Sequence, residues 1–193
     1  MSGRDDALEQ RLTTLLDQGE EAAAVASAIR GYGPQILGYL AVVLRSDDAA
    51  AEVFSDFAED LLNGIGGFRR ESSFRVWAYA LAWRAAQKWR RDAFRQRTRA
   101  LYTSEAARIA EEVRTSLPSR VARRDHVERL REQLDPEDQA LLVLRFDRDL
   151  SWTEVAHALS EAGEPVAEAA LRKRFERLKA RLQELADDKA SPA

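Results

Sequence analysis

The sequence contains no cysteine among its 193 residues. This absence excludes disulfide bonds and thiolate metal ligands, and it is typical of proteins of a reducing cytoplasm. Long apolar runs are missing as well: the longest is too short to cross a bilayer, and no signal peptide precedes the acidic residues Asp5 and Asp6. We therefore expect a cytoplasmic protein that does not insert into a membrane.

Histidine is also scarce. The only two, His126 and His157, fall in separate predicted helices without the spacing of metal ligands. The sequence has no glycine-rich phosphate loop and no grouping of serine, histidine and aspartate that would suit a nucleophile. The carboxylates fit helix caps and surfaces. We expect no enzyme activity, no cofactor and no metal site.

Proline and glycine are few, and they stand between segments rather than in tracts: there are five prolines and nine glycines. The remaining sequence is 45% hydrophobic and 33% charged, with long stretches of alanine, leucine, glutamate and arginine. Such residues favour helices. We predict an all-α protein with two helical domains, at 1–99 and 126–193, joined by a linker at 100–125.

The first domain shows four stretches of helical periodicity, which we place at 7–30, 36–44, 47–63 and 74–91. Gly31, Gly33 and Pro34 are expected to separate the first two stretches. Ser72 and Ser73 are candidate N-caps of the fourth. Its expected inward stripe consists of Phe74, Trp77, Leu81, Ala85 and Trp89.

The sequence of the second domain predicts three helical segments. Asp135 and Pro136 mark a helix start with proline at the first helical position. Ser151 and Glu154 have the spacing of a capping box. A long helix is expected over 167–185, with an apolar seam at Leu171, Phe175, Leu178, Leu182 and Leu185.

Charge is strongly segregated along the chain. Residues 69–99 carry a local charge of +8 and residues 172–181 a charge of +5, although the whole chain has a net charge of −3. The remainder therefore carries −16. Two basic segments on an acidic body predict two separate surfaces that attract phosphate groups.

The second basic segment suits duplex DNA. A helix, a short helix, a turn and a basic helix form the layout of a helix-turn-helix motif, whose last helix enters the major groove. With the apolar seam facing inward, Arg172 and Lys173 are candidate readers of base edges, and Arg177 and Lys179 are candidate phosphate contacts. Glu168 and Glu176 lie on the same outward face. A solvated face of an ordinary helical bundle would give the same pattern.

The first basic segment suits unpaired strands. Tyr79 and Trp83 lie one helical turn apart, beside Arg84, Lys88 and Arg91. Aromatic rings stack on bases, and each such contact contributes about 1–3 kcal/mol. The alternative is that these aromatic side chains belong to the core, which we expect for Trp77 and Trp89.

A third surface is acidic. Between residues 52 and 60 the apolar positions step by about four residues, and they leave Glu52, Asp56, Glu59 and Asp60 outside. This face is either simply solvated or a docking surface for a basic partner protein.

Two stretches resemble a known family. Residues 50–91, AAEVFSDFAEDLLNGIGGFRRESSFRVWAYALAWRAAQKWRR, resemble region 2 of the sigma-70 family of transcription factors. Residues 134–182, LDPEDQALLVLRFDRDLSWTEVAHAL…ALRKRFERLKARL, resemble region 4. With these two regions alone, the chain is similar to sigma factors of the extracytoplasmic-function (ECF) type.

The resemblance implies a partner and a mechanism. Such factors bind the bacterial RNA polymerase core enzyme and direct promoter-specific initiation of transcription; an anti-sigma protein is a further candidate partner. Polymerase binding is implied for Glu52, Asp56, Glu59 and Asp60. Contacts with the melted −10 element are implied for Arg75, Tyr79, Trp83, Arg84, Lys88 and Arg91. Contacts with the −35 duplex are implied for Glu168, Arg172, Lys173, Glu176, Arg177 and Lys179.

The sequence departs from the family pattern at three places. Ser55 and Asp56 stand where the family usually has Gln-Glu, and Trp83 and Arg84 stand where it has Arg-Asn. The turn at 160–166 is longer than the usual Gly-Ile-Ser. Two alternatives stay open: a stand-alone helix-turn-helix regulator of duplex DNA, and a sigma-like adaptor that binds polymerase or an anti-sigma protein without reading DNA.

Overall fold

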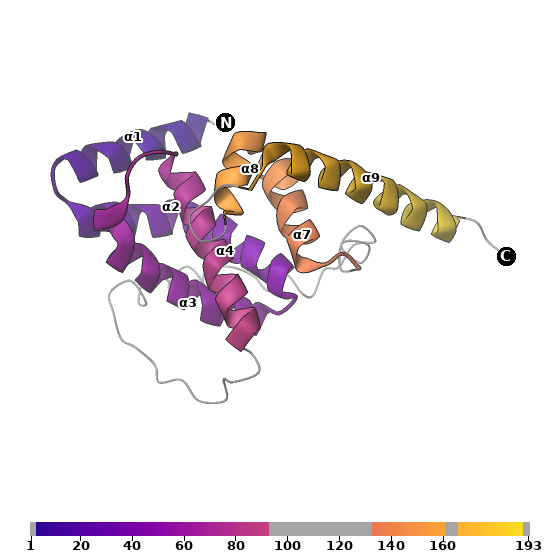
Figure 1. The fold of residues 1–193 in the computed structure, drawn as a ribbon. Coiled ribbons are helices and arrows are strands. Elements are labelled where there is room, and N and C mark those ends of the chain that lie inside the picture. Colours follow the sequence, from indigo (N-terminus) through magenta and orange to yellow (C-terminus); the bar gives the residue numbers. More distant parts are fainter. Residues whose placement is uncertain (1–2, 93–132, 161–165, 191–193) are drawn as a thin grey trace.

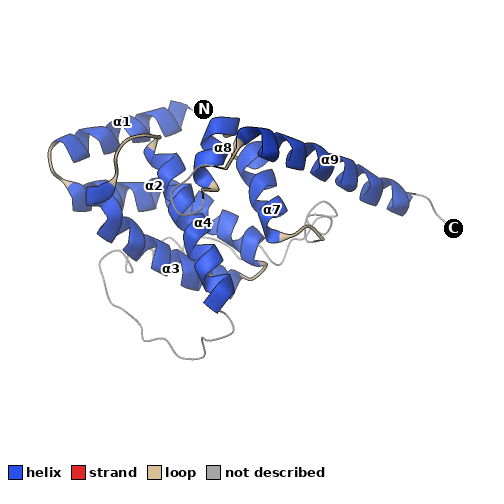
Figure 2. Ribbon diagram, in the orientation of Figure 1, coloured by secondary structure: helices blue, strands red, loops and turns tan. Residues whose placement is uncertain are grey.

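A computed structural model describes residues 3–92, 133–160 and 166–190 (Figure 1). Every regular element within these ranges is helical, and none of them is a strand (Figure 2). The all-α prediction is confirmed. Among the described residues, no helix is both long and apolar enough to span a membrane.

The N-terminal part contains four helices: α1 (Gly3–Asp17), α2 (Glu21–Leu44), α3 (Asp47–Gly64) and α4 (Phe74–Asp92). A 3₁₀ turn, η1 (Ile65–Gly67), follows α3. The apolar helix α2 is central, because it packs against α1, α3 and α4. Its buried side chains include Tyr32, Tyr39 and Leu40.

The expected break at Gly31, Gly33 and Pro34 is wrong, because α2 runs through all three residues. The chain turns earlier, at Gly19, which has a φ of 76°. A side chain at Gly31 would place its Cβ 2.1 Å from Leu8 Cδ2 of α1, so glycine permits close packing of α1 on α2. Buried tertiary contacts therefore outweigh the weak helix propensity of this stretch.

The other predicted helix starts agree with the structure. Ser46 caps α3 by accepting a hydrogen bond from the backbone N–H of Ala49, and the helix begins at Asp47, the first residue of the predicted stretch. Ser73 accepts the N–H of Val76 in the first turn of α4. These side chains satisfy amide groups that have no partner within the helix.

The C-terminal part contains α7 (Pro136–Leu142), a single π turn η2 (Val143–Asp147), α8 (Trp152–Ala158) and α9 (Glu168–Ala190). Asp135 is the N-cap of α7, with Pro136 at its start, and Ser151 and Glu154 form a complete capping box on α8. Both of these predicted helix starts are confirmed, and α9 begins one residue after the predicted start at 167. Helix α9 extends away from the rest of the molecule (Figure 1).

The two parts share one apolar core. Helix α8 packs against α4, and α7 packs against α2. The largest cluster of buried side chains continues from α2, α3 and α4 into α7 and α8. The predicted linker at 100–125 lies outside the described residues, and the division into domains at 1–99 and 126–193 stays a prediction.

Candidate nucleic-acid interface

The acidic surface lies on α3. Val53, Phe54 and Phe57 are buried on the inner side of this helix. On the outer side, Glu52 and Asp60 are exposed, whereas Asp56 and Glu59 are half-buried. The carboxylate of Glu52 accepts a hydrogen bond from the indole Nε1–H of Trp89 at 3.2 Å. The expected outward orientation of this face is thus seen, and one of its carboxylates also joins α3 to α4.

Helix α4 divides the six residues assigned to the −10 element into two groups. Arg75, Tyr79 and Trp83 follow one another at four-residue spacing and are only 7%, 0% and 4% exposed. The remaining three, in the last turns of the helix, are exposed: Arg84, Lys88 and Arg91. We call the first group the covered stripe and the second group the exposed cations.

The packing expected for the aromatic side chains of α4 is partly wrong. Phe74 and Ala85 are buried as expected, whereas Trp77, Leu81 and Trp89 are half-buried and pack against the edge of the same core. Trp77 packs on Phe68, with ring centroids 4.9 Å apart. Residues of α4 up to Trp83 are buried on nearly every side, because α1, α2, α3 and α8 all contact this helix. A helix surrounded in this way has no single inward stripe.

Arg75 is held from two sides. Its guanidinium donates a hydrogen bond to the backbone carbonyl of Arg148 at 3.0 Å, and it lies 3.5 Å from the carboxylate of Asp5. In turn, the guanidinium of Arg148 donates to the carbonyl of Gln35 in α2 at 3.2 Å. Two arginines therefore connect α4 and α2 to the segment between η2 and α8.

Tyr79 lies at the centre of this junction. Its ring packs edge-on against the ring of Tyr39, with centroids 5.5 Å apart. Burial raises the pKa of Tyr79, and the neighbouring guanidinium groups of Arg148 and Arg75 oppose that rise. Both tyrosines are therefore neutral, and in this arrangement neither ring is available for stacking on a base.

The candidate duplex-reading surface on α9 is open. Leu171 and Leu178 are buried and Phe175 is half-buried, as the predicted seam requires. The residues assigned to the −35 element lie off this seam, where Glu168 is half-buried and the other five are exposed: Arg172, Lys173, Glu176, Arg177 and Lys179.

Contacts within the protein already orient part of this surface. Glu168 accepts a hydrogen bond from Thr153 at 2.7 Å and another from Arg172 at 3.1 Å, and these bonds lower the pKa of Glu168. The guanidinium groups of Arg172 and Arg145 each lie 5.3 Å from the ring centroid of Trp152. Such cation–π contacts position Arg172 at the start of α9.

A cluster of ionic contacts fixes α9 on α7. The guanidinium of Arg174 contacts the carboxylates of Asp135, Glu137 and Asp138 at the start of α7. Partial burial raises the pKa of Asp138 despite Arg174. Partial burial also favours a higher pKa for Asp135. The hydrogen bond from the backbone N–H of Asp138 and the charge of Arg174 outweigh this effect, so the pKa of Asp135 is lowered. Arg174 was not singled out in the sequence, because a lone arginine in a basic helix gives no signal of its partners.

Sequence reasoning also missed Glu9 of α1. Its carboxylate accepts hydrogen bonds from the backbone N–H groups of Phe74 and Arg75 at 3.0 and 2.8 Å, and from the hydroxyl of Tyr32 at 2.8 Å. A carboxylate at this place complements the positive end of α4. No local motif marks it, since its partners lie far along the chain.

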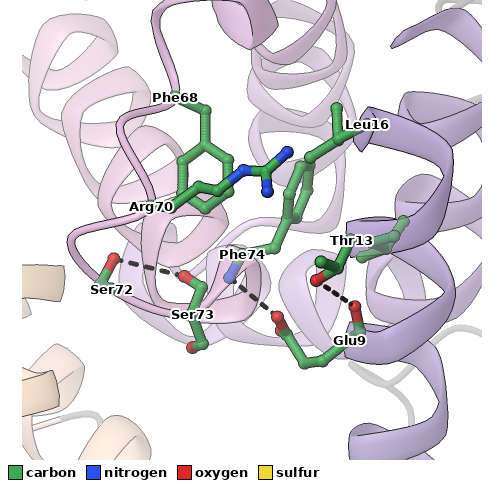
Figure 3. A pocket seen from close by; sticks show the side chains of 9 residues that line it. Glu9, Thr13, Leu16, Phe68, Arg70, Ser72, Ser73 and Phe74 are labelled. Carbon is green, nitrogen blue, oxygen red and sulfur yellow. Dashed lines mark hydrogen bonds between the residues drawn. The ribbon is translucent and has the colours of Figure 1, made fainter. Parts of the chain in front are cut away.

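Glu9 lines a small pocket between α1 and the segment leading into α4 (Figure 3). The pocket has a volume of about 220 Å³. Apolar walls come from both elements: Leu12, Leu16, Phe68 and Phe74. Arg70 lies at its edge, has a φ of 59°, and pairs with Asp17 at 2.7 Å. No group of three or more histidine, aspartate or glutamate side chains suited to a metal ion occurs within the described ranges.

Comparison with known proteins gives one informative similarity. No family model matches the chain. The chain is 27% identical over 137 residues to the RNA polymerase sigma factor YlaC of Bacillus subtilis (strain 168). This alignment covers 70% of the chain and 79% of that protein. The similarity supports the resemblance to sigma factors in general, while the extracytoplasmic-function type stays a prediction.

Proposed function

We propose that this protein is a sigma factor of the extracytoplasmic-function type, which binds the bacterial RNA polymerase core enzyme and directs it to promoters. The observation that carries the proposal is its similarity to YlaC over most of both chains. The arrangement of charge supports it, because an acidic helix, a basic helix rich in aromatic residues and a basic helix-turn-helix occur in one chain. In this role the protein contributes binding energy and needs no catalytic group of its own.

Polymerase binding is assigned to the outer face of α3. Glu52 and Asp60 are exposed there, and Asp56 and Glu59 lie beside them. A row of carboxylates on a rigid helix is suited to a basic partner surface, where complementary charge increases the association rate and selects the partner. The buried residues of the same helix fix its orientation in the core.

Recognition of the −35 element is assigned to α9. Arg172 and Lys173 lie near its N-terminal end, which enters the major groove first in a helix-turn-helix. Arg177 and Lys179 follow on the exposed surface, where they can contact phosphate groups. The pairing of Glu168 with Arg172, at 3.1 Å, restrains the arginine side chain before DNA binds.

Recognition of the −10 element is assigned to α4. The exposed cations Arg84, Lys88 and Arg91 can attract the backbone of a separated strand. The covered stripe of Arg75, Tyr79 and Trp83 supplies the aromatic rings that stack on unpaired bases. These rings need a change of conformation before they can act.

Co-elution with bacterial RNA polymerase core on a sizing column tests the proposal. We expect a stoichiometric complex with the unmodified chain, and none with the variant Glu52→Lys/Asp56→Lys. The matched control is Asp6→Lys/Glu21→Lys, which reverses two exposed acidic residues on α1 and α2. If none of the three folded proteins formed a complex with polymerase, the proposal would be contradicted. Equal binding by all three proteins would contradict it as well.

One observation favours a second candidate function. The basic surface of α9 is open while the aromatic residues of α4 are covered, which is the arrangement expected of a stand-alone regulator of duplex DNA. Such a regulator would bind its duplex without polymerase, and its affinity would fall steeply with salt. Tight binding of a specific duplex by the chain alone, without polymerase binding, would favour this candidate.

A further inference from the structure

We propose that Trp152 and Thr153, at the start of α8, are positioning residues that fix the guanidinium of Arg172 and thereby set its selectivity for one base of the −35 duplex. The inference rests on the proposed function, because it concerns the duplex-reading surface of α9. It deepens that function by adding two residues of the preceding helix, neither of which is among the six assigned to the −35 element.

Arg172 is restrained by contacts that its neighbours lack. Its guanidinium lies over the ring of Trp152, 5.3 Å from the ring centroid, and its Nη2 donates a hydrogen bond to Glu168 at 3.1 Å. In the described part of the chain, neither Lys173 nor Arg177 has a hydrogen bond, an ion pair or a ring contact. A free arginine side chain samples many rotamers, so these two contacts favour one orientation of Arg172 before DNA binds.

The ring of Trp152 is itself held on several sides. Phe175 of the α9 seam packs edge-on against it, with ring centroids 5.5 Å apart. The guanidinium of Arg145 also lies 5.3 Å from its centroid, and Arg145 donates a hydrogen bond to the backbone carbonyl of Leu150 at 3.1 Å. A half-buried ring with these neighbours gives Arg172 a fixed surface to rest on.

Thr153 fixes the other contact of Arg172. Its hydroxyl donates to Oε1 of Glu168 at 2.7 Å, whereas Arg172 donates to Oε2 of the same carboxylate. Both oxygens are therefore engaged, and the carboxylate cannot turn without losing a hydrogen bond. Because Thr153 and Trp152 belong to α8, the orientation of Arg172 depends on that helix twice, through a hydroxyl and through a ring.

The restrained arginine keeps donors for DNA. The bond to Glu168 uses one N–H group of Nη2, and the remaining N–H groups of Arg172 stay available. Two N–H groups of one arginine can bind O6 and N7 of guanine in the major groove. An oriented side chain makes this contact with little further loss of entropy, but it cannot turn toward another base without leaving the ring. The preferred base is favoured and its competitors are disfavoured, which is selectivity.

Discrimination between duplexes tests the inference. The affinity of the polymerase complex is measured for the preferred −35 duplex and for one changed at the base whose preference Arg172→Ala abolishes. We expect the ratio of the two affinities to fall about two- to fivefold in Trp152→Leu, because an exposed cation–π contact supplies that much. The ratio should return in Trp152→Tyr, which restores an aromatic ring.

Thr153→Val makes the test independent of the folding of Trp152→Leu, because Thr153 is exposed and the change removes only its hydroxyl. We expect the ratio to fall here too, by a smaller factor. The matched control is Thr14→Val, which removes an exposed hydroxyl of α1 and should leave the ratio unchanged. Unchanged ratios in both Trp152→Leu and Thr153→Val would overturn the inference.

The same substitutions in the Arg172→Ala background separate a positioning role from a structural one. If Trp152 acts through Arg172, Trp152→Leu changes the affinities no further once Arg172 is absent. A structural defect would instead weaken both duplexes alike and would persist in the Arg172→Ala background. That second result would overturn the inference.

The motion of Arg172 in the free chain can be measured without polymerase or DNA. NMR relaxation of the side-chain Nε–H group should give a higher order parameter for Arg172 than for Arg177 on the same helix, and Trp152→Leu should lower it toward that of Arg177. Equal order parameters in the unmodified chain would overturn the inference. An ordered Arg172 in a chain whose polymerase complex distinguishes no −35 duplexes would instead contradict the proposed function, and the selectivity assigned to Arg172 with it.

Discussion

The carboxylate of Glu9 accepts a hydrogen bond from the backbone N–H of Arg75 at 2.8 Å, although 66 positions separate the two residues. The contact joins the first helix of the chain to the helix that carries the covered stripe. It gives α1 a defined role, because Glu9 caps the first two amide groups of α4 in addition to the local cap that Ser73 provides on Val76. The orientation of α4 therefore depends on residues that precede it by a long stretch of chain.

Substitution of Glu9 is expected to destabilise the fold. Glu9→Ala leaves two amide groups of α4 and the hydroxyl of Tyr32 without their acceptor, at a cost of about 1–3 kcal/mol per buried group. The free energy of unfolding, measured with urea, should fall by at least the lower figure. The exposed neighbour Gln10 provides the control, because Gln10→Ala should change stability by less than about 0.5 kcal/mol. Equal effects of the two substitutions would show that the cap is unimportant.

Two tyrosines that differ in one hydrogen bond provide a second prediction. The hydroxyl of Tyr39 is buried without a partner, whereas the hydroxyl of Tyr32 donates to Glu9 at 2.8 Å. Removing an unsatisfied polar group from the interior is favourable, so Tyr39→Phe should stabilise the protein by about 1 kcal/mol. Tyr32→Phe should destabilise it by a similar amount. Thermal unfolding would show the opposite signs, and a loss of stability in Tyr39→Phe would contradict the prediction.

The elements that the sequence predicts correctly are those with local signals. The capping box of Ser151 and Glu154 and the proline start at Pro136 depend on residues within one turn. The seam of α9 follows from periodicity alone. Leu171 and Leu178 are seven residues apart, about two helical turns, so both lie on the buried side of the helix. None of these features needs information from elsewhere in the chain.

The features that sequence reasoning missed depend on distant partners. Continuity of α2 through Gly31 depends on the approach of Leu8 from α1. Burial of Tyr79 and Trp83 depends on the helices that surround α4, and one of these, α8, lies about seventy residues further along the chain. An aromatic pair beside arginines looks the same in sequence whether it faces solvent or another helix. Periodicity could not separate these cases, because α4 is enclosed on nearly every side up to Trp83.

Arg174 is expected to make the stability of the C-terminal helices depend on pH. The pKa of Asp135 is lowered in the folded protein. Its contribution to the free energy of unfolding is therefore present above the pKa of the unfolded chain, 3.8, and is lost as the pH falls through the lower pKa of the folded protein. The pKa of Asp138 is raised, so its contribution has the opposite sign and opposes that of Asp135. Arg174→Ala should cost about 1 kcal/mol at neutral pH, because these contacts are only partly buried.

The cost of Arg174→Ala should shrink below about pH 3.8, where the carboxylates become protonated and no longer need the cation. Urea unfolding at pH 7 and pH 3, followed by circular dichroism, would measure both values. Arg181→Ala is a suitable comparison, because Arg181 is exposed on the same helix. A cost that does not vary with pH would show that Arg174 acts through its packing rather than its charge.

The two kinds of contact assigned to α9 predict different responses to salt. Arg177→Ala/Lys179→Ala removes two candidate phosphate contacts, so the slope of log affinity against log salt concentration should decrease by about 2, for every promoter sequence alike. Arg172→Ala/Lys173→Ala removes candidate readers of base edges and should weaken binding by about 1–3 kcal/mol for each substituted side chain, mainly on the preferred −35 sequence.

Arg30→Ala, at an exposed site on α2, is the control for the removal of a positive charge. Affinities of the polymerase complex for matched and mismatched −35 duplexes, at several salt concentrations, would separate the two pairs. If Arg172→Ala/Lys173→Ala weakened both duplexes equally, these residues would be phosphate contacts, and the reading of base edges would have to come from elsewhere on α9.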